Sequence, residues 1–305
     1  MKALYDIQAP AKLNRFLHIT GRRDDGYHLL QSVFMLVDWC DTLHFEVRTD
    51  GEISREDLST HLPPDDLILK AARTLQLATQ TSLGVHIGVL KSIPAQAGMG
   101  GGSSDAASTL LALNRLWNTQ LPMDKLMQLG LQLGADVPFF IGGSNAWVEG
   151  IGEIITPIKL TPGRFLVVKP EQGLETKSIF LDPFLKRDTK HSIITGFAVE
   201  NFDFGRNDLQ PVAIKLCSRI SDAIEWLSSL GLNGRMTGSG SAVFAHMPND
   251  LDLKEAPSGF QIKACHMLEA HPLWGWARSS GYRFAAPAVH PCRGVAQSVT
   301  ALDCG

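Results

Sequence analysis

The sequence has few cysteines, little net charge and no long apolar run. None of its 5 cysteines forms a C-x-x-C pair, which argues against a zinc site or a disulfide framework and favours a reducing compartment, the cytoplasm. The 28 basic and 31 acidic residues leave a net charge of −3 without a basic block, so we expect no nucleic-acid partner. Because no run of about 18 apolar residues occurs and residues 1–10 lack an apolar stretch, we expect neither a membrane span nor a signal peptide.

The chain is long enough for two domains. It has 305 residues, of which 44% are hydrophobic, so it can bury a full core. The turn Thr161-Pro-Gly163 marks the expected boundary between an N-terminal domain, residues 1–160, and a C-terminal domain, residues 161–280. Residues 281–305 are rich in Ala, Pro, Ser and Gly without periodicity, and we expect them to form a poorly ordered tail.

Helical and strand-like patterns are mixed along the chain. Apolar residues at three- and four-residue steps predict helices at residues 65–80, 104–116, 123–133 and 208–230. Alternating or short apolar runs predict strands at residues 12–19, 30–36, 43–48, 85–90, 146–148, 154–158, 165–168 and 261–267. Because the two kinds do not alternate strictly, the sequence favours an α+β fold over a doubly wound sheet.

A glycine-rich run at residues 94–107 is the most informative pattern. Gly100–Ser104 contains only glycine and serine and leads into a predicted helix, so bare N–H groups and a helix N-terminus offer a site for an anion, most often a phosphate. No Gly-Lys-Ser/Thr of a P-loop follows, and Ser103 stands where a dinucleotide fingerprint needs a third glycine. A tight turn is the alternative, although three consecutive glycines cost conformational entropy. We interpret Asp105 as a charge at the helix start.

Three separated motifs occur together in this chain. Pro10-Ala-Lys-Leu-Asn14, the glycine run ending at Ser104, and Thr237-Gly-Ser-Gly-Ser241 occur in the order seen in GHMP kinases, and the sequence resembles that family over residues 2–278. The resemblance implies a two-domain α+β fold. It combines an N-terminal ribosomal-protein-S5-domain-2-like domain with a C-terminal ferredoxin-like α/β domain, and the active site lies in the cleft between them.

Two further strings narrow the resemblance. Gly21-Arg-Arg-Asp-Asp-Gly-Tyr-His28 and Gly134-Ala-Asp-Val-Pro-Phe-Phe140 resemble the branch of GHMP kinases that acts on a cytidine-diphosphate sugar alcohol. The branch implies phosphorylation of the substrate's 2-hydroxyl by ATP, in the non-mevalonate route to isoprenoid precursors. Another GHMP kinase, of the homoserine or mevalonate type, and a non-catalytic nucleotide-binding regulator are the alternatives. The sequence leaves open whether the protein is a monomer or a homodimer.

The resemblance assigns the chemistry to Lys12 and Asp136. The matching Asp of the family is the general base that takes the proton of the attacking hydroxyl. The matching Lys lies beside it, where a cation keeps the carboxylate ionised. Without the family, Asp136 is a turn-forming residue and Lys12 an exposed strand lysine. Pro138 is expected to hold Val137 in an extended conformation.

The resemblance also assigns substrate binding to four residues. Tyr27 and Phe180 are expected to stack on the cytosine, and His28 to hydrogen-bond its edge. Asn14 is expected to hydrogen-bond the substrate. A lone Tyr-His pair is usually ordinary surface or core, so these roles rest on the family match.

Nucleotide binding is assigned to the glycine run and to a second loop. Gly238, Ser239 and Gly240, which could otherwise be a plain hairpin turn, are expected to support the run and the transferring phosphate. Mg²⁺ is expected to accompany ATP, with Ser103 or Ser104 touching it and its other protein ligands unknown. The stretch expected to contact ATP is Pro94, Ala95, Gln96, Ala97, Gly98, Met99, Gly100, Gly101, Gly102, Ser103 and Ser104.

Overall fold

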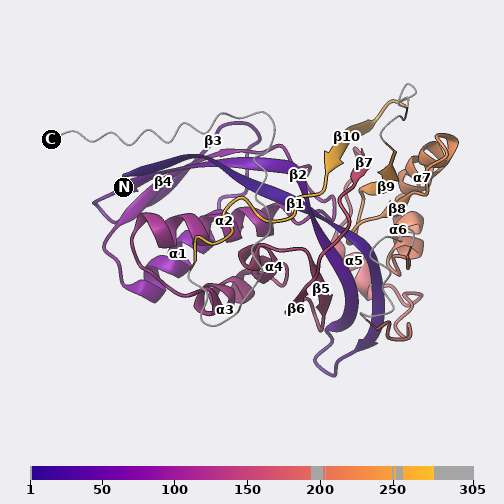
Figure 1. Cartoon of the computed structure of the whole chain (residues 1–305), viewed down its shortest axis with the longest axis horizontal. Coiled ribbons are helices and arrows are strands. Elements are labelled where there is room, and N and C mark those ends of the chain that lie inside the picture. Colours follow the sequence, from indigo (N-terminus) through magenta and orange to yellow (C-terminus); the bar gives the residue numbers. More distant parts are fainter. Residues whose placement is uncertain (1, 194–201, 203, 249–250, 252–256, 278–305) are drawn as a thin grey trace.

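The protein contains two β-sheets flanked by helices. The computed structural model describes residues 2–193, 202, 204–248, 251 and 257–277. Figure 1 shows two lobes, with the long strands β1 (Ala3–Arg22) and β2 (His28–Arg48) running from one toward the other. This mixture of sheets and packed helices confirms the predicted α+β class.

The first sheet is formed by the N-terminal half of the chain. Besides β1 and β2 it contains β3 (Ile53–Asp57), β4 (Gly84–Leu90), β5 (Ala146–Glu149) and β6 (Ile154–Pro157). The strand order is β3-β4-β2-β5-β6, and β1 pairs antiparallel with β2. The register of that pair shifts at several places, one of them between Asn14 and Leu17, so that bulges bend both strands.

Helices cover one face of the first sheet (Figure 1). They are α1 (Leu67–Thr79), α2 (Gly101–Leu116), α3 (Met123–Leu133) and α4 (Val137–Gly142). Their apolar stripes pack on the inward side chains of β2 and β4, which include Phe45 and Ile87. The burial of this shared apolar surface is what holds helices and sheet together.

The second sheet is formed by the C-terminal half of the chain. Its order is β10-β7-β9-β8, and all of these pairs are antiparallel. The strands are β7 (Arg164–Pro170), β8 (Arg235–Met236), β9 (Val243–Met247) and β10 (Phe260–His266). Helices α6 (Gln210–Leu216) and α7 (Arg219–Ser229) pack on one face, and α5 (Thr176–Leu181) lies between β7 and α6 in the chain.

A third apolar cluster joins the two lobes. It combines Leu13 of β1 and Met35 of β2 with Phe165 of β7 and Phe244 of β9, and it includes Met99 of the glycine run. The two sheets take their strands from either side of the turn at 161–163. The domain ranges 1–160 and 161–280 remain a prediction, and the expected tail at 281–305 lies outside the described residues.

Several predicted elements differ from the observed ones. The helix predicted over residues 208–230 is two helices, because Cys217 adopts an extended conformation (φ −146°, ψ 94°) between α6 and α7. The helix predicted from Ser104 begins at Gly101, since Gly100 is left-handed (φ 72°) and directs the next glycines into the first turn. The short elements β3, α4 and α5 carry too few residues to show a period, and the sequence did not predict them.

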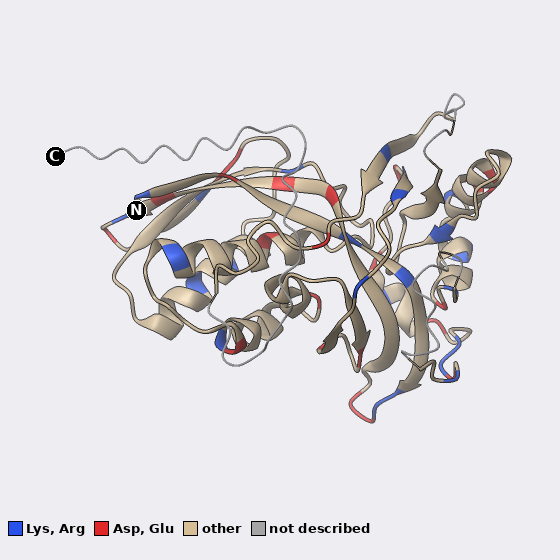
Figure 2. Ribbon diagram, in the orientation of Figure 1, with Lys and Arg blue, Asp and Glu red and all other residues tan. Residues whose placement is uncertain are grey.

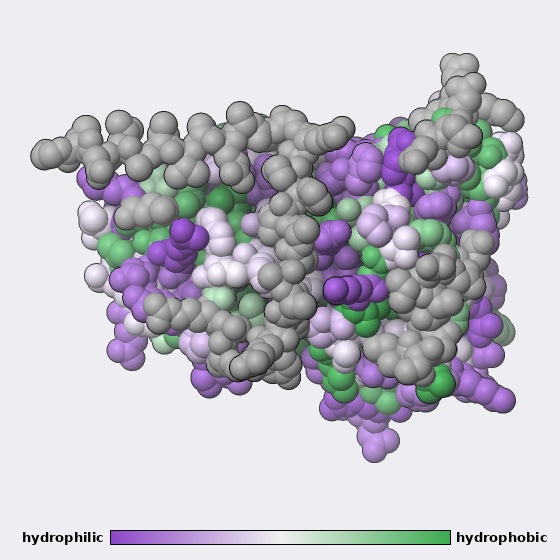
Figure 3. All heavy atoms as spheres, viewed as in Figure 1, coloured by the Kyte–Doolittle hydropathy of each residue, from purple (hydrophilic) through white to green (hydrophobic). Residues whose placement is uncertain are grey.

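The surface carries charges of both signs. Figure 2 shows Lys and Arg interspersed with Asp and Glu over both lobes. In the view of Figure 3, hydrophobic residues form scattered patches among hydrophilic ones. Among the described residues, no helix combines the length and apolar character that crossing a membrane requires.

Candidate active site

The glycine run forms the turn that opens α2. The Ser104 N–H donates to Gly100 O at 2.9 Å, which closes the first helical turn. The N–H groups of the preceding residues have no partner within the helix, so the run and the helix dipole favour an anion at this end. The side chain of Ser104 is fully buried, and its Oγ has no hydrogen-bond partner. A bound phosphate or its metal ion could supply the partner that this buried hydroxyl lacks.

The two glycine-rich loops pack backbone against backbone. Ser241 N donates to Gln96 O at 3.0 Å. A Cβ at Gly98 (φ +71°) would lie 2.3 Å from Thr237 O, and a Cβ at Gly238 (φ +53°) would lie 2.5 Å from Gly98 O. Neither position therefore accepts a side chain, because the backbone is left-handed there and a Cβ would clash with the other loop. The physical reason for glycine in both motifs is this close approach.

Two members of the predicted ATP stretch point away from the ligand side. Ala97 and Met99 are buried in the cluster between the lobes, so their side chains belong to the core. Met99 O accepts a hydrogen bond of 2.9 Å from Lys12 N, which fastens β1 to the run. Any contact of these two residues with ATP is therefore limited to backbone atoms.

Lys12 and Asp136 lie together at the base of the glycine run. Lys12 Nζ is 3.5 Å from Asp136 Oδ2 and donates to Asn14 Oδ1 at 2.5 Å. The ammonium also lies 4.6 Å from the centroid of the Phe34 ring. Lys12 is 4% exposed, so the alternative of an exposed strand lysine is wrong, and its side chain lies on the same face of β1 as that of Asn14. Burial strengthens the attraction between the ammonium and its partners.

Asp136 stands directly before α4. Its side chain is 29% exposed, and it makes no capping bond to the helix, so the carboxylate is free to face an incoming group. Val137 is the first residue of α4, so the predicted extended conformation is wrong; Pro138 lies in the first helical turn, where its missing N–H costs nothing. A Cβ at Gly134 would lie 3.8 Å from Ser103 Oγ, so the segment before Asp136 adjoins the start of α2.

Asn14 is held by two hydroxyl side chains, those of Ser32 and Thr237. Its Nδ2 donates to Ser32 Oγ at 2.9 Å, and its backbone N–H donates to Thr237 Oγ1 at 2.9 Å. Thr237 is fully buried and directly precedes the second glycine loop. The same threonine therefore ties the strand of Lys12 to the loop that packs on the glycine run.

Lys91 forms a buried ion cluster behind the run. Its Nζ contacts carboxylates of Asp41, on β2, and Asp105, on α2, the latter at 2.5 Å. Asp105 is not in the first turn of α2, because the helix starts earlier than predicted; its interpretation as a helix-start charge is therefore wrong. Burial raises the pKa of Asp105 to about 7, although the Lys91 ammonium acts in the opposite direction. Asp41 Oδ1 accepts from Ser92 N and Ile93 N and so fixes the residues that lead into the run.

His28 and Phe180 form an aromatic pair at a second place. Their ring centroids are 5.0 Å apart, with the planes tilted by 33°. Arg187 Nε donates to His28 Nε2 at 2.9 Å, and Arg187 Nη2 donates to Phe180 O at 3.1 Å. Burial, together with the nearby cations of Arg187 and Arg22, lowers the pKa of His28. His28 is therefore neutral at pH 7. The sequence did not point to Arg187, and no local pattern marks it.

Tyr27 is open to solvent beside this pair. It is 60% exposed, and its carbonyl accepts from Arg23 N at 2.8 Å in the turn between β1 and β2. The structure therefore brings His28 and Phe180 together and leaves the Tyr27 ring outward. Thr176, at the start of α5, shares a 2.7 Å hydrogen bond with Ser239 of the second glycine loop, so α5 links that loop to Phe180.

A cavity of about 400 Å³ lies elsewhere, on the opposite face of the first sheet. Its residues come from β1 to β4 and from the chain after β3, and none of them belongs to the loops around Lys12 and Asp136. We do not include it in the candidate active site. The cavity is lined by Tyr5, His44, Glu46, Glu56, Leu58, His86 and Gly88.

Within the described part of the chain, no group of three or more His, Cys, Asp or Glu side chains is arranged to hold a metal ion.

Comparison with known proteins agrees with this geometry. Residues 66–144 match the family model of the GHMP kinases N terminal domain, and residues 194–262 match that of GHMP kinases C terminal. A crystal structure of 4-(cytidine 5'-diphospho)-2C-methyl-D-erythritol kinase superposes with a TM-score of 0.71 at 29% identity, over 86% of this chain and 98% of that one. A homoserine kinase from Cytophaga hutchinsonii gives a TM-score of 0.64 at 11% identity, over 89% and 96%, which supports the fold alone.

Relatives from bacteria are much more similar in sequence. A 4-diphosphocytidyl-2-C-methyl-D-erythritol kinase of Albidiferax ferrireducens is 68% identical, over 92% of this chain and 97% of the relative. The kinase of the same name from Variovorax paradoxus is 61% identical, over 91% and 100%. These matches confirm the resemblance that the motifs indicate. The chain belongs to the 4-diphosphocytidyl-2-C-methyl-D-erythritol kinases, a family of GHMP kinases.

Proposed function

We propose that this chain transfers the γ-phosphoryl group of ATP to the 2-hydroxyl of 4-diphosphocytidyl-2-C-methyl-D-erythritol. The products are the 2-phosphate and ADP, and the reaction is a step of the non-mevalonate route to isoprenoid precursors. The observation that carries the proposal is the pair of Lys12 and Asp136, 3.5 Å apart, beside the glycine run that opens α2. Family membership at 68% identity supports the same conclusion.

Asp136 is the proposed general base. Its partly exposed carboxylate can accept the proton of the 2-hydroxyl as that oxygen attacks phosphorus. Lys12 Nζ, 3.5 Å from that carboxylate, holds it by electrostatic attraction and is proposed to stabilise negative charge that develops on the transferred group. Asn14 holds the Lys12 ammonium by a 2.5 Å hydrogen bond and is proposed to orient the substrate. In phosphoryl transfer the protein contributes mainly positioning and charge stabilisation, and these three side chains supply both.

The glycine run is the proposed site of the triphosphate. Its N–H groups and the N-terminus of α2 favour an anion, while the loop at Gly238–Gly240 supports the run from behind. Ser103 and the unpartnered hydroxyl of Ser104 are the proposed protein contacts of Mg²⁺. When bound with ATP, Mg²⁺ supplies positive charge that neutralises the phosphates during transfer.

The second subsite is proposed to bind the cytosine. Phe180 offers a ring for stacking, and neutral His28 offers its imidazole to the base edge, with Tyr27 as a further ring on the open side. We place the reaction in the cytoplasm, where ATP is abundant and thiols stay reduced.

A panel of acceptor alcohols tests the proposal. ADP release is measured with ATP, Mg²⁺ and the cytidine substrate, homoserine or mevalonate in turn. We expect turnover with the cytidine substrate alone. Turnover with homoserine or mevalonate instead would assign the chain to another GHMP activity. Binding of ATP without ADP release from any acceptor would favour a non-catalytic regulator.

A further inference from the structure

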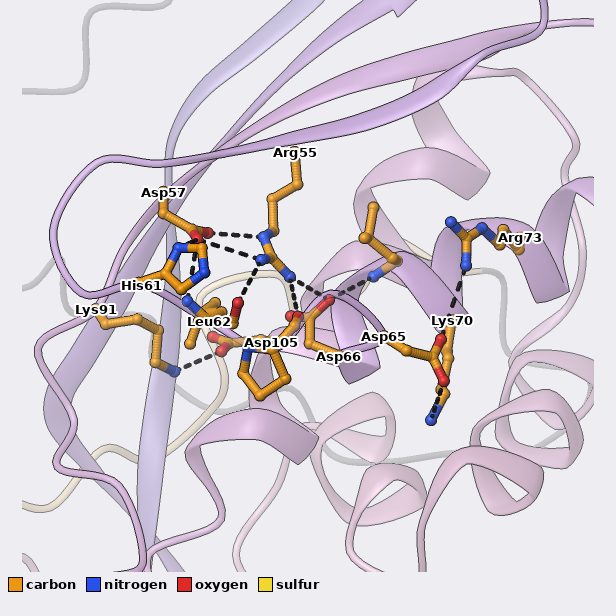
Figure 4. Close-up of polar contacts among 12 residues, drawn as sticks. Arg55, Asp57, His61, Leu62, Asp65, Asp66, Lys70, Arg73, Lys91 and Asp105 are labelled. Atoms are coloured by element: carbon orange, nitrogen blue, oxygen red, sulfur yellow. Dashed lines mark hydrogen bonds and ion pairs between the residues drawn. The ribbon is translucent and has the colours of Figure 1, made fainter.

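Arg55 is the centre of a polar network at one edge of the first lobe. Its guanidinium donates to Asp57 at 2.7 Å and 3.2 Å, and it contacts Asp66 Oδ1 at 2.7 Å. It also donates to the carbonyl oxygens of Leu62 and Pro63, both at 3.1 Å. Figure 4 shows the guanidinium at the point where these contacts converge. Lysine could not reproduce this arrangement, because the guanidinium spreads five N–H donors over a planar fork, whereas an ammonium has three donors at a single point.

The network fixes the segment that joins β3 to α1, residues 58–66. Asp57 Oδ2 accepts from Leu62 N at 3.0 Å, and Asp66 Oδ1 accepts from Leu69 N at 3.1 Å as the cap of α1. The side chain of Arg55 is 7% exposed, and those of both carboxylate partners are nearly as buried. Removing one partner of an ion pair that is shielded from water costs much more stability than removing one partner of a surface pair.

Segment 58–66 and the residue that follows it, Leu67, contact residues before and within the glycine run. Ser59 Oγ accepts from Lys91 N at 2.7 Å, immediately before the run. Leu67, at the start of α1, lies 3.7 Å from the position of a Cβ at Gly102, in the first turn of α2. Lys91 Nζ contacts Asp105 on α2, as Figure 4 also shows. A shift of segment 58–66 is thus transmitted through Ser59 to the residues that lead into the run, and through the adjoining Leu67 to its α2 part.

We propose that Arg55 is a positioning residue for nucleotide binding, which holds segment 58–66, and with it Leu67, against residues before and within the glycine run. The inference rests on the proposed function, because it takes the run to be the ATP site. The hydrogen bonds and ion pairs that the structure gives for Arg55, on β3, go to residues between 57 and 66, and none goes to Lys12, Asn14 or Asp136. Its loss should therefore weaken ATP binding and leave binding of the cytidine substrate nearly unchanged.

Three Arg55-network variants and one control test this inference. We expect Arg55→Met, which keeps the length of the side chain, to raise KM for ATP by about tenfold and to change KM for the cytidine substrate by less than about twofold. For Arg55→Lys we expect a KM for ATP between those of the unaltered protein and Arg55→Met. The matched control is Arg48→Met, because Arg48 makes ion pairs with Asp50 and Glu52 at the surface of the same sheet. It should leave both KM values unchanged.

A second readout does not depend on turnover. A non-hydrolysable ATP analogue should raise the melting temperature of the unaltered protein and of Arg48→Met, and it should raise that of Arg55→Met much less at equal concentration. This test remains informative if the protein phosphorylates a different alcohol. An Arg55→Met protein that folds and keeps its KM for ATP and its analogue-induced shift would overturn the inference. Equal increases of both KM values would also overturn it, since they indicate a general structural role.

Asp66→Asn covers the case in which Arg55→Met does not fold. Asparagine still caps α1 but loses the charge that pairs with Arg55. We expect a rise of about threefold in KM for ATP, with KM for the cytidine substrate unchanged. No rise in a folded Asp66→Asn protein would count against the network.

Discussion

The two ends of the proposed active site are built in different ways. At the phosphoryl-transfer end, two glycine loops touch through their backbones, and the Lys12 ammonium is buried among Asn14, Phe34 and Asp136. At the end proposed to bind the cytosine, here called the cytosine-binding end, the rings are half-buried or exposed. There a single guanidinium, that of Arg187, holds His28 beside Phe180. The groups of the first end are held in place by contacts within the protein. The second end offers aromatic surface that the substrate itself would cover.

This difference follows from what each end has to do. Stabilising charge in a transition state requires donors and cations that are already fixed, because their reorganisation would cost part of the gain. Holding a planar base requires area and one or two directional bonds, and stacking supplies about 1–3 kcal/mol per base. Changes at the first end should therefore act mainly on kcat or on folding, and changes at the second end mainly on KM.

Asp136→Asn should have the largest effect. Asparagine keeps the size of the side chain but cannot accept the hydroxyl proton, so we expect kcat to fall by about 10²–10⁴-fold with little change in either KM. Initial rates at saturating ATP and cytidine substrate measure this. The matched control is Asp222→Asn, which makes the same chemical change at an exposed ion pair on α7. Turnover of Asp136→Asn close to that of the control would remove Asp136 from the role of base.

Gly98→Ala should damage the same end through packing. The new Cβ would meet Thr237 O at 2.3 Å, so the two loops must separate. We expect a loss of about 3 kcal/mol in the free energy of unfolding, compared with about 1 kcal/mol for Gly231→Ala. Gly231 has a similar φ of +74° but nothing within 4 Å, so the pair separates the steric cost from the backbone cost. Denaturant melts measure both. Equal losses would mean that the contact between the loops contributes nothing.

The sequence predicted the first end better than the second. Gly98 and Gly238 could be found because a close approach of two backbones demands glycine, and such a demand is visible in the residues themselves. The family motifs predicted that Lys12 lies beside Asp136, which the structure shows, whereas the strand pattern alone suggested an exposed lysine. The error arose because both faces of β1 are covered, one by α2 and α4 and the other by the second lobe. Alternation does not reveal burial on both faces.

Arg187 and the break at Cys217 were not predicted, for two different physical reasons. Arg187 lies 159 residues from its partner His28, and no local spacing records a contact made by the folded chain. The apolar stripe over residues 208–230 has the period of one helix, but the chain bends at Cys217 so that α6 and α7 each pack on the second sheet. Tertiary packing outweighed local periodicity at this point.

Removing the aromatic pair should affect binding and spare the chemistry. We expect His28→Ala to raise KM for the cytidine substrate by about tenfold, and Phe180→Leu by about three- to tenfold, with kcat changed by less than about twofold. Phe184→Leu is the matched control, because Phe184 lies shortly after the end of α5, the helix that carries Phe180, and is 77% exposed. Initial rates over a range of substrate concentrations measure all three. A fall in kcat at constant KM in His28→Ala or Phe180→Leu would contradict the expectation that changes at this end act mainly on KM.

The smallest expected effect is a dependence of substrate binding on pH. Burial, aided by Arg187 and Arg22, lowers the pKa of His28, so the imidazole is neutral above its ordinary value of about 6.5. Neutral Nε2 accepts the Arg187 hydrogen bond, and this contribution is fully present above that value. It is lost as the pH falls through the lowered pKa, because protonation then removes the acceptor and sets two cations side by side.

We therefore expect KM for the cytidine substrate to be flat from pH 7 to 8 and to rise by about two- to fivefold as the pH approaches 5. The measurement is KM across this range at saturating ATP, with kcat followed separately because other groups of the site titrate as well. His28→Gln supplies the control, since a glutamine can accept from Arg187 without titrating. A rise in KM that persists in His28→Gln would place the titrating group elsewhere. The affinity of the cytosine-binding end would then come from stacking and not from the neutral imidazole.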